Sequence, residues 1–109
     1  MADTRALYQE GLQHFVAERY DDAIACYRRA VEADAAFALG WNGLAMALSR
    51  KGDLDGAIAA ARRLVELEPE EPLAHTSLSI FYQQKGMIPE AEEEKALAMR
   101  LQMKRQRPR

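Results

Sequence analysis

The sequence has few of the residues that crosslink a chain, anchor it in a membrane or direct its export. Cysteine occurs once, at Cys26, which excludes an intramolecular disulfide and a C-x-x-C metal knuckle. No apolar run approaches the roughly 18–20 residues that a membrane span needs. Residues 1–5 lack a basic segment followed by an apolar stretch, so we expect no secretory signal. The expected compartment is a reducing one, most simply the cytoplasm.

Glycine, proline and aromatic residues are also scarce, with 6 glycines, 4 prolines and 7% aromatic residues. Apolar residues make up 49% of the chain and the net charge is only −2, which excludes the composition of an intrinsically disordered protein. Alanine is common, and this favours helices that pack closely. A chain of 109 residues fits one domain, which we predict to span residues 1–109.

The sequence aligns with itself after a shift of 34 residues, without an insertion. The shift brings Ala23, Ala57 and Ala91 into register, and it also aligns Gly52 with Gly86. Apolar residues recur three and four positions apart, which is the period of an α-helix. We therefore predict six helices, at about 4–18, 21–34, 38–50, 54–68, 72–85 and 89–104.

In this pattern, small residues occupy the positions where paired helices approach closely, and large apolar residues occupy the positions that fill the core. Gly11, Ala45 and Ser79 are expected to face small residues across each helix pair, because a larger side chain there would force the helices apart. The residues expected to fill the core between the helices are Trp41, Leu44, Leu48, Ile58, Leu64 and Leu67.

The 34-residue pattern resembles the tetratricopeptide repeat, W-x2-L-G-x2-Y followed by A-x3-F and P. The middle unit is the most similar, with Trp41, Leu44, Ala45, Leu48, Ala57 and Pro69. The resemblance covers about residues 4–105 and implies an all-α, right-handed α-solenoid of three helix–turn–helix units. The units are expected at about 4–37, 38–71 and 72–105, followed by a basic tail at 104–109. Three units are near the minimum for stability, because one unit cannot bury its apolar face alone.

By this resemblance, the first helix of each unit lines a concave groove. Leu12, Met46 and Ile80 share one repeat position and would form an apolar stripe. Such a groove suits an extended peptide or an amphipathic helix of another protein, so we expect an adaptor or scaffold. The alternative is that these side chains pack on their neighbours and leave a small exposed patch. The expected groove residues are Tyr8, Leu12, Phe15, Leu39, Asn42, Met46, Arg50, Leu73, Thr76, Ile80 and Gln84, with Val16 beside them.

One ligand class of the family can be tested by residue type. Co-chaperone members hold the terminal carboxylate of heat-shock proteins with lysine, asparagine and arginine side chains. At the matching positions this chain has Tyr8, Leu12, Gly43, Leu73 and Ser77. None of these is a cation, so a carboxylate would find no charge-assisted partner. We therefore expect that such a carboxylate is not the ligand.

The last predicted helix departs from the repeat. Glu92 and Lys95 stand where the earlier units have apolar residues, which indicates that this face meets water and that no fourth unit follows. Met99, Leu101 and Met103 are nevertheless apolar. Self-association through this helix, giving a homo-oligomer, is therefore the main alternative function.

The basic tail supports a third hypothesis. All acidic residues lie within 1–99, whereas residues 100–109 carry only basic charges. Such a tail can bind the anionic surface of a nucleic acid or a membrane. It has no aromatic residue for base stacking, however, and it follows an acidic body that would repel phosphates. We therefore expect neither as a partner, and we interpret the tail as support for the helix dipole.

Catalysis finds little support in the sequence. His14 and His75 occupy repeat positions of core aromatic residues, and we predict no local zinc pair at either one. Cys26 lies on an inward-leaning helix face, where a thiol is usually inert. No nucleophile elbow or phosphate-binding glycine loop is present. We expect no enzyme activity, no cofactor, no metal site and no small-molecule substrate.

Overall fold

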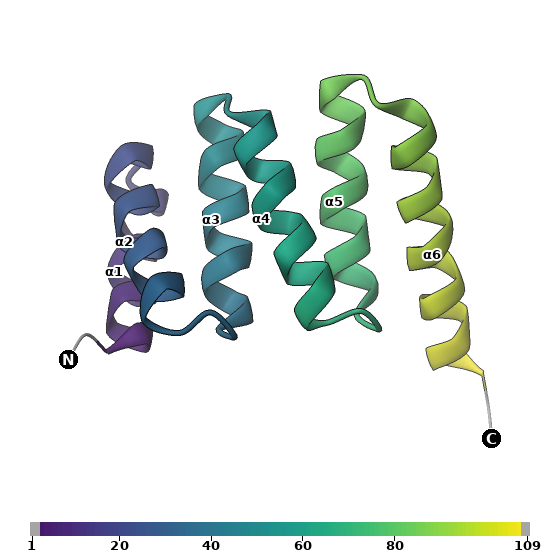
Figure 1. Cartoon of the computed structure of the whole chain (residues 1–109), viewed down its shortest axis with the longest axis horizontal. Helices are drawn as coiled ribbons and strands as arrows, with labels where there is room; N and C mark the ends of the chain where they lie inside the picture. The colour runs from purple at the N-terminus through teal and green to yellow at the C-terminus, as the bar shows by residue number, and fades with distance from the viewer. Residues whose placement is uncertain (1–2, 108–109) are drawn as a thin grey trace.

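The computed structural model describes residues 3–107, which contain six α-helices and no strand. Consecutive helices pack against one another to form a row, with the first and the last helix at its opposite ends (Figure 1). None of the described helices is both long enough and apolar enough to cross a bilayer. The helices are α1 (Thr4–Val16), α2 (Tyr20–Ala33), α3 (Ala38–Lys51), α4 (Leu54–Leu67), α5 (Pro72–Lys85) and α6 (Ile88–Gln106).

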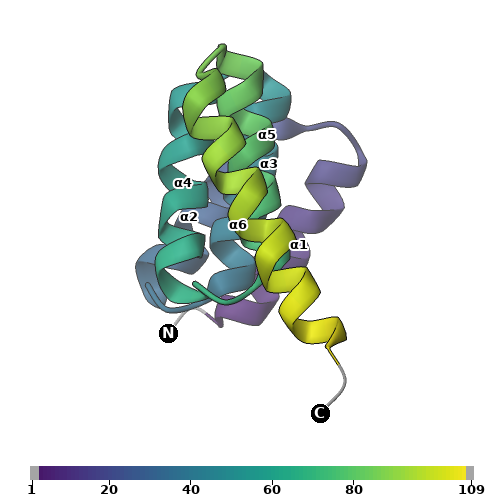
Figure 2. The same cartoon turned by 90° about the vertical axis from the view of Figure 1, so that its right-hand side faces the viewer.

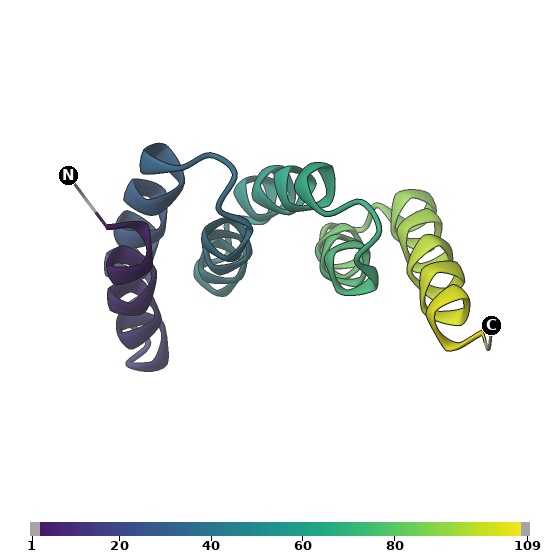
Figure 3. The ribbon, with the colours of Figure 1, turned by 90° about the horizontal axis from the view of Figure 1, so that it is seen from below.

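The row of helices curves. Seen from below, α3 and α5 lie on one side of the row and α4 lies on the other (Figure 3). The molecule measures 42 × 35 × 21 Å, so it is a thin, curved slab. The fold is the predicted all-α solenoid, and each helix begins and ends within two residues of its predicted bounds.

Local sequence signals set several helix ends. The Asp53 carboxylate accepts a hydrogen bond from the Gly56 N–H at 2.9 Å and caps α4. Helices α3 and α5 are followed directly by Gly52 and Gly86, whose φ angles are 95° and 86°. This left-handed conformation favours glycine. The first unit has Glu18 at the same position, and its φ is 62°.

The core lies between the paired helices and is built from small residues around one large ring. Tyr27 of α2 is almost fully buried and lies between Gly11 of α1 and Gly43 of α3. A Cβ atom at either glycine would lie 2.7 Å from Cε1 of Tyr27. The two glycines therefore make the space that the ring fills, at the junction of three helices.

Two of the six predicted core residues are not buried. Trp41 is half-buried, its indole N–H donates to the Ala35 carbonyl at 2.8 Å, and the Arg63 guanidinium lies over its ring. Leu67 is the last residue of α4 and is exposed, because the chain leaves the helix pair there. The other four predicted core residues, Leu44, Leu48, Ile58 and Leu64, are buried.

Two ion pairs, 34 residues apart, connect successive units. Lys51 pairs with Asp21, and Lys85 pairs with Asp55. Each pair joins the end of a first helix to the start of the second helix in the preceding unit. All four side chains are exposed, so each pair contributes at most about 1 kcal/mol. Their repetition supports the register of the stack.

The predicted basic tail begins inside α6, which continues to Gln106. The Arg105 guanidinium pairs with the Glu71 carboxylate at 2.8 Å and ties the end of α6 to the start of α5. Residues 108–109 of the predicted tail lie outside the described residues.

Candidate functional site

The eleven predicted groove residues lie on α1, α3 and α5. Within each helix they are three or four positions apart, so each set follows one helix face. Helix α1 carries Tyr8, Leu12 and Phe15; α3 carries Leu39, Asn42, Met46 and Arg50; and α5 carries Leu73, Thr76, Ile80 and Gln84.

A first pocket of about 180 Å³ lies between α1 and α3, and we call it the α1–α3 pocket. Tyr8 packs against Phe37 and Tyr27 with ring centroids 5.8 Å apart in both pairs, which gives the pocket an aromatic wall. Burial raises the pKa of Tyr27 to about 12, so its hydroxyl stays protonated at neutral pH. The lining residues are Tyr8, Leu12, Phe15, Tyr27, Asn42, Gly43 and Met46.

A second pocket of about 260 Å³ lies between α3 and α5, and we call it the α3–α5 pocket. Leu39 and Leu73 are its exposed apolar residues, and Asn42 lines both pockets. Two carboxylates, of Glu68 and Glu71, lie at the end of α4 and the start of α5. The lining residues are Ala38, Leu39, Asn42, Leu64, Glu68, Glu71, Leu73, Ala74 and Ser77.

The sequence pattern did not point to the two glutamates, because groove positions were assigned to first helices only. The connection between the second and third units also lines the α3–α5 pocket, and the acidic stretch before Pro72 was the available signal. The pKa of Glu71 is lowered by the hydrogen bond from Arg105 and by the Leu73 N–H. Apolar and aromatic side chains make up most of the lining of both pockets, and the second also has two carboxylates at one end, of which that of Glu71 is paired with Arg105.

Some of the predicted polar groove residues are engaged within the protein. The Arg50 guanidinium lies 5.4 Å from the centre of the Phe15 ring. The Thr76 hydroxyl donates to the carbonyl four residues earlier at 3.0 Å, and Gln84 accepts a hydrogen bond from the Ser49 hydroxyl at 3.3 Å. The predicted residues that line neither of these two pockets are Arg50, Thr76, Ile80 and Gln84.

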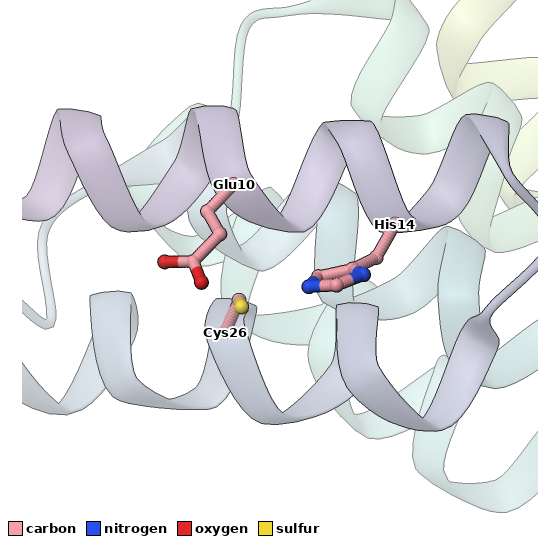
Figure 4. A group of neighbouring side chains, drawn as sticks. All are labelled: Glu10, His14 and Cys26. Carbon is pink, nitrogen blue, oxygen red and sulfur yellow. The ribbon is translucent and has the colours of Figure 1, made fainter.

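The two histidines differ in their surroundings. His75 is buried, with one ring nitrogen 2.7 Å from the Pro69 carbonyl and the other 2.6 Å from the Glu94 carboxylate, so it links α5 to α6. His14 lies beside Glu10 and Cys26, and the potential ligand atoms of the three residues are within 4.8 Å of one another (Figure 4). The prediction of no ligand pair at His14 overlooked Glu10, which stands four residues earlier on the same helix.

Comparison with known proteins identifies the repeat. A family model described as "Tetratricopeptide repeat" matches residues 8–72, more than half of the chain. No curated protein sequence matches this chain.

Solved structures support the same fold. A crystal structure of MamA is 24% identical, with a TM-score of 0.90, and the alignment covers 94% of this chain and 60% of MamA. The second TPR of Spaghetti (RPAP3), bound to the HSP90 peptide SRMEEVD, is 23% identical, with a TM-score of 0.84 and coverage of 90% and 91%. The type III secretion translocator chaperone SycD of Yersinia enterocolitica is 23% identical, with a TM-score of 0.84 and coverage of 90% and 74%.

The family model and the fold agree, and both are typical of protein-interaction scaffolds. This chain spans about 60% of the length of MamA. The 34-residue register, the paired helices and the match over residues 8–72 together show that the chain belongs to the tetratricopeptide repeat family.

Proposed function

We propose that this protein is an adaptor that binds a segment of another protein along α1, α3 and α5. The observation that carries the proposal is a set of large apolar side chains exposed on these helices. Leu12 is 42% exposed, Leu39 50%, Leu73 71% and Ile80 46%. An exposed apolar set beside two pockets is typical of an interaction site.

The two pockets suggest how a ligand would lie. Each pocket would take an apolar anchor side chain, from an extended peptide or from one face of a helix. Asn42 lines both pockets, so its amide is placed to bond a ligand between the anchors. Burial of a few such anchors at about 1.5–3 kcal/mol each would support micromolar binding after the costs of association.

Charge at the α3–α5 pocket favours one class of ligand. Glu68 and Glu71 line the pocket, and the Glu71 carboxylate is already paired with Arg105 of α6. A ligand with lysine or arginine beside its apolar anchor would complement the carboxylate of Glu68. We do not expect this chain to bind the peptide that the Spaghetti repeat binds, because the positions that match the carboxylate-binding residues of co-chaperones carry no cation here.

Peptide-display panning tests the proposal. The protein would be compared with a Leu39→Glu, Leu73→Glu variant, whose changes are at exposed positions. Met46 is left unchanged because it packs against the core. An Ile88→Glu, Met99→Glu variant adds the same charge on α6 and is the matched control. Circular dichroism would establish that both variants fold.

Peptides that bind the wild type and the control, but not the groove variant, would support the proposal. An excess of basic–apolar motifs among them would support the role of the glutamates. Equal enrichment on all three proteins would contradict groove binding and move the site to another surface.

A second candidate function, self-association, is favoured by α6. Helix α6 forms the end of the row, and one long face of it points away from the other described helices (Figure 2). Met99 is 58% exposed and Met103 63%. A molecular mass that rises with concentration, and falls after Met99→Glu and Met103→Glu, would support this function. A constant monomer mass at high concentration would contradict it.

A further inference from the structure

We infer that Glu10, His14 and Cys26 form a binding site for a zinc-type transition-metal dication between α1 and α2. Figure 4 shows the three side chains converging in the space between the two helices. Their potential ligand atoms lie within 4.8 Å of one another. Around tetrahedral zinc, with bonds of about 2.0–2.3 Å, ligand atoms are about 3.4–3.6 Å apart. Side-chain rotations that close about 1 Å would complete the geometry.

The helices already place the three donors. Glu10 and His14 are four residues apart on α1, so their side chains share one helix face. Cys26 approaches from α2, and it is only 7% exposed. Two donors therefore come from one helix and the third from its partner. Glu10 is exposed, which leaves a fourth coordination position for water.

The ring of His14 has one nitrogen available for a metal. Nδ1 accepts a hydrogen bond from Nε of Arg19 at 3.1 Å, and the other ring nitrogen points toward Glu10 and Cys26 (Figure 4). That nitrogen, Nε2, carries the ring proton while Nδ1 accepts. Metal binding at Nε2 would move the ring proton to Nδ1 and release the Arg19 side chain, which is exposed.

The repeat register shows that helix packing does not require these residue types. A shift of 34 residues places Glu10, His14 and Cys26 over apolar residues of the second unit, which are buried: Leu44, Leu48 and Ala60. The first unit thus carries three metal-ligating side chains at positions where the same fold uses a packed apolar cluster.

Metal binding would release one proton, from the thiol of Cys26. Burial raises the pKa of the Cys26 thiol, Glu10 and Asp22 raise it further, and Arg29 lowers it. The thiol is therefore protonated in the metal-free protein at neutral pH. On binding, the S–H bond breaks, the sulfur–metal bond forms and the proton passes to the buffer. The thiolate and the Glu10 carboxylate then balance the two charges of the metal.

This proton exchange gives the site a pH dependence. Because one proton is released for each metal bound, the affinity should fall as the pH is lowered. The bound metal would also hold α1 against α2 within the first unit. Thermal unfolding should therefore shift upward as the metal concentration increases.

Cobalt(II) and zinc(II) titrations of the full chain, in a non-chelating reductant, test the site. We expect one metal per chain, a sulfur-to-cobalt charge-transfer band and release of one proton, measured by calorimetry in two buffers. Cys26→Ala gives the first unit the alanine that the second unit carries at the equivalent position, Ala60. This variant should remove the band and weaken metal binding at least about tenfold. Loss of a residue that only supports a metal ligand already costs about tenfold in affinity, so loss of a ligand should cost no less.

Two further variants separate the site from the fold. Glu10→Leu, His14→Leu and Cys26→Ala together carry the residues of the second unit, and this variant should stay helical and bind no metal. Glu32→Gln removes one carboxylate from an exposed position on α2 and should leave affinity unchanged. Three outcomes would overturn the site: no saturable uptake by the wild type, full uptake by the triple variant, or cobalt binding without the charge-transfer band.

Discussion

At the scale of residues, the units fill the same space in different ways. Tyr27 fills the junction of α1, α2 and α3, where Gly11 and Gly43 leave room for its ring. At the next junction, formed by α3, α4 and α5, Ala61 stands at the tyrosine position, and Ala45 and Ser77 stand at the two glycine positions. The ring that fills the first junction therefore has no counterpart at the second.

Gly43→Ala should destabilise the protein. The new Cβ would lie 2.7 Å from the Tyr27 ring, and overpacking of this kind costs about 1–3 kcal/mol. Alanine regains up to about 1 kcal/mol of helix propensity, so a net loss of about 1 kcal/mol is expected in urea unfolding.

A double-mutant cycle gives the control for this prediction. With Tyr27→Leu already present, Gly43→Ala should be neutral or slightly stabilising, because the clash is gone. Equal effects in both backgrounds would show that the ring and the glycine do not share this space.

At the scale of elements, the turns inside the three units share one geometry but not one residue. The turns after α3 and α5 use Gly52 and Gly86, with positive φ angles, whereas the first unit uses Glu18 at φ 62°. A left-handed conformation costs a non-glycine residue about 1–2 kcal/mol. The first turn is therefore the strained one.

Glu18→Gly should stabilise the protein. Glycine removes the strain but gives the unfolded chain more freedom, which costs about 0.5–1 kcal/mol. The expected net gain is about 0.5–1 kcal/mol, seen as a higher urea midpoint with an unchanged slope. Glu18→Ala, which keeps the strain, should give no such gain. An equal gain in the alanine variant would assign the effect to charge.

The contact between α5 and α6 predicts a pH effect. The Arg105 hydrogen bond and the Leu73 N–H hold the pKa of Glu71 below its ordinary value. A carboxyl whose pKa is lower in the folded state stabilises the fold above its unfolded pKa. That stabilisation is lost as the pH falls through the folded pKa. The contribution should therefore disappear under acid conditions.

Arg105→Gln should raise the pKa of Glu71 toward its ordinary value, measured by NMR titration of the side-chain carboxyl carbon. Lys104→Gln removes the same charge from the neighbouring residue and should change this pKa much less. Equal shifts in the two variants would mean that general charge, rather than the 2.8 Å contact, sets the pKa.

At the scale of the whole molecule, the last helix differs from the second helices of the earlier units. The second helices of the first two units carry Ile24 and Ile58 at one repeat position, and both are buried. Helix α6 has Glu92 at this position and Lys95 three residues later, and both are exposed. These two charges give this face of α6 a hydrated, polar surface.

Glu92→Ile with Lys95→Ala should convert this end into a stacking surface, because these are the residues that the second unit carries. We expect an average mass that rises with concentration more steeply than in the wild type, measured by sedimentation velocity. Glu93→Ile with Arg100→Ala changes two other exposed charges on α6 and is the control. A variant that remains monomeric, or a control with the same gain, would contradict this role for the two charges.

Much of this protein follows from the sequence alone. The 34-residue register, the apolar spacing and the placed glycines determine six paired helices, because each signal acts within a few residues along the chain. The placement of the predicted groove residues on one face each of α1, α3 and α5 follows from the same register, since every unit repeats one local geometry.

The tertiary structure decided which side chains from different helices and different units became neighbours. It brought Glu68 and Glu71 to the α3–α5 pocket, exposed Leu67 at the end of α4, and gathered Cys26 from α2 with Glu10 and His14 from α1. A repeat pattern specifies which residues share a helix face, but helix packing specifies which faces meet. Side chains from separate helices therefore became neighbours only once the solenoid was assembled.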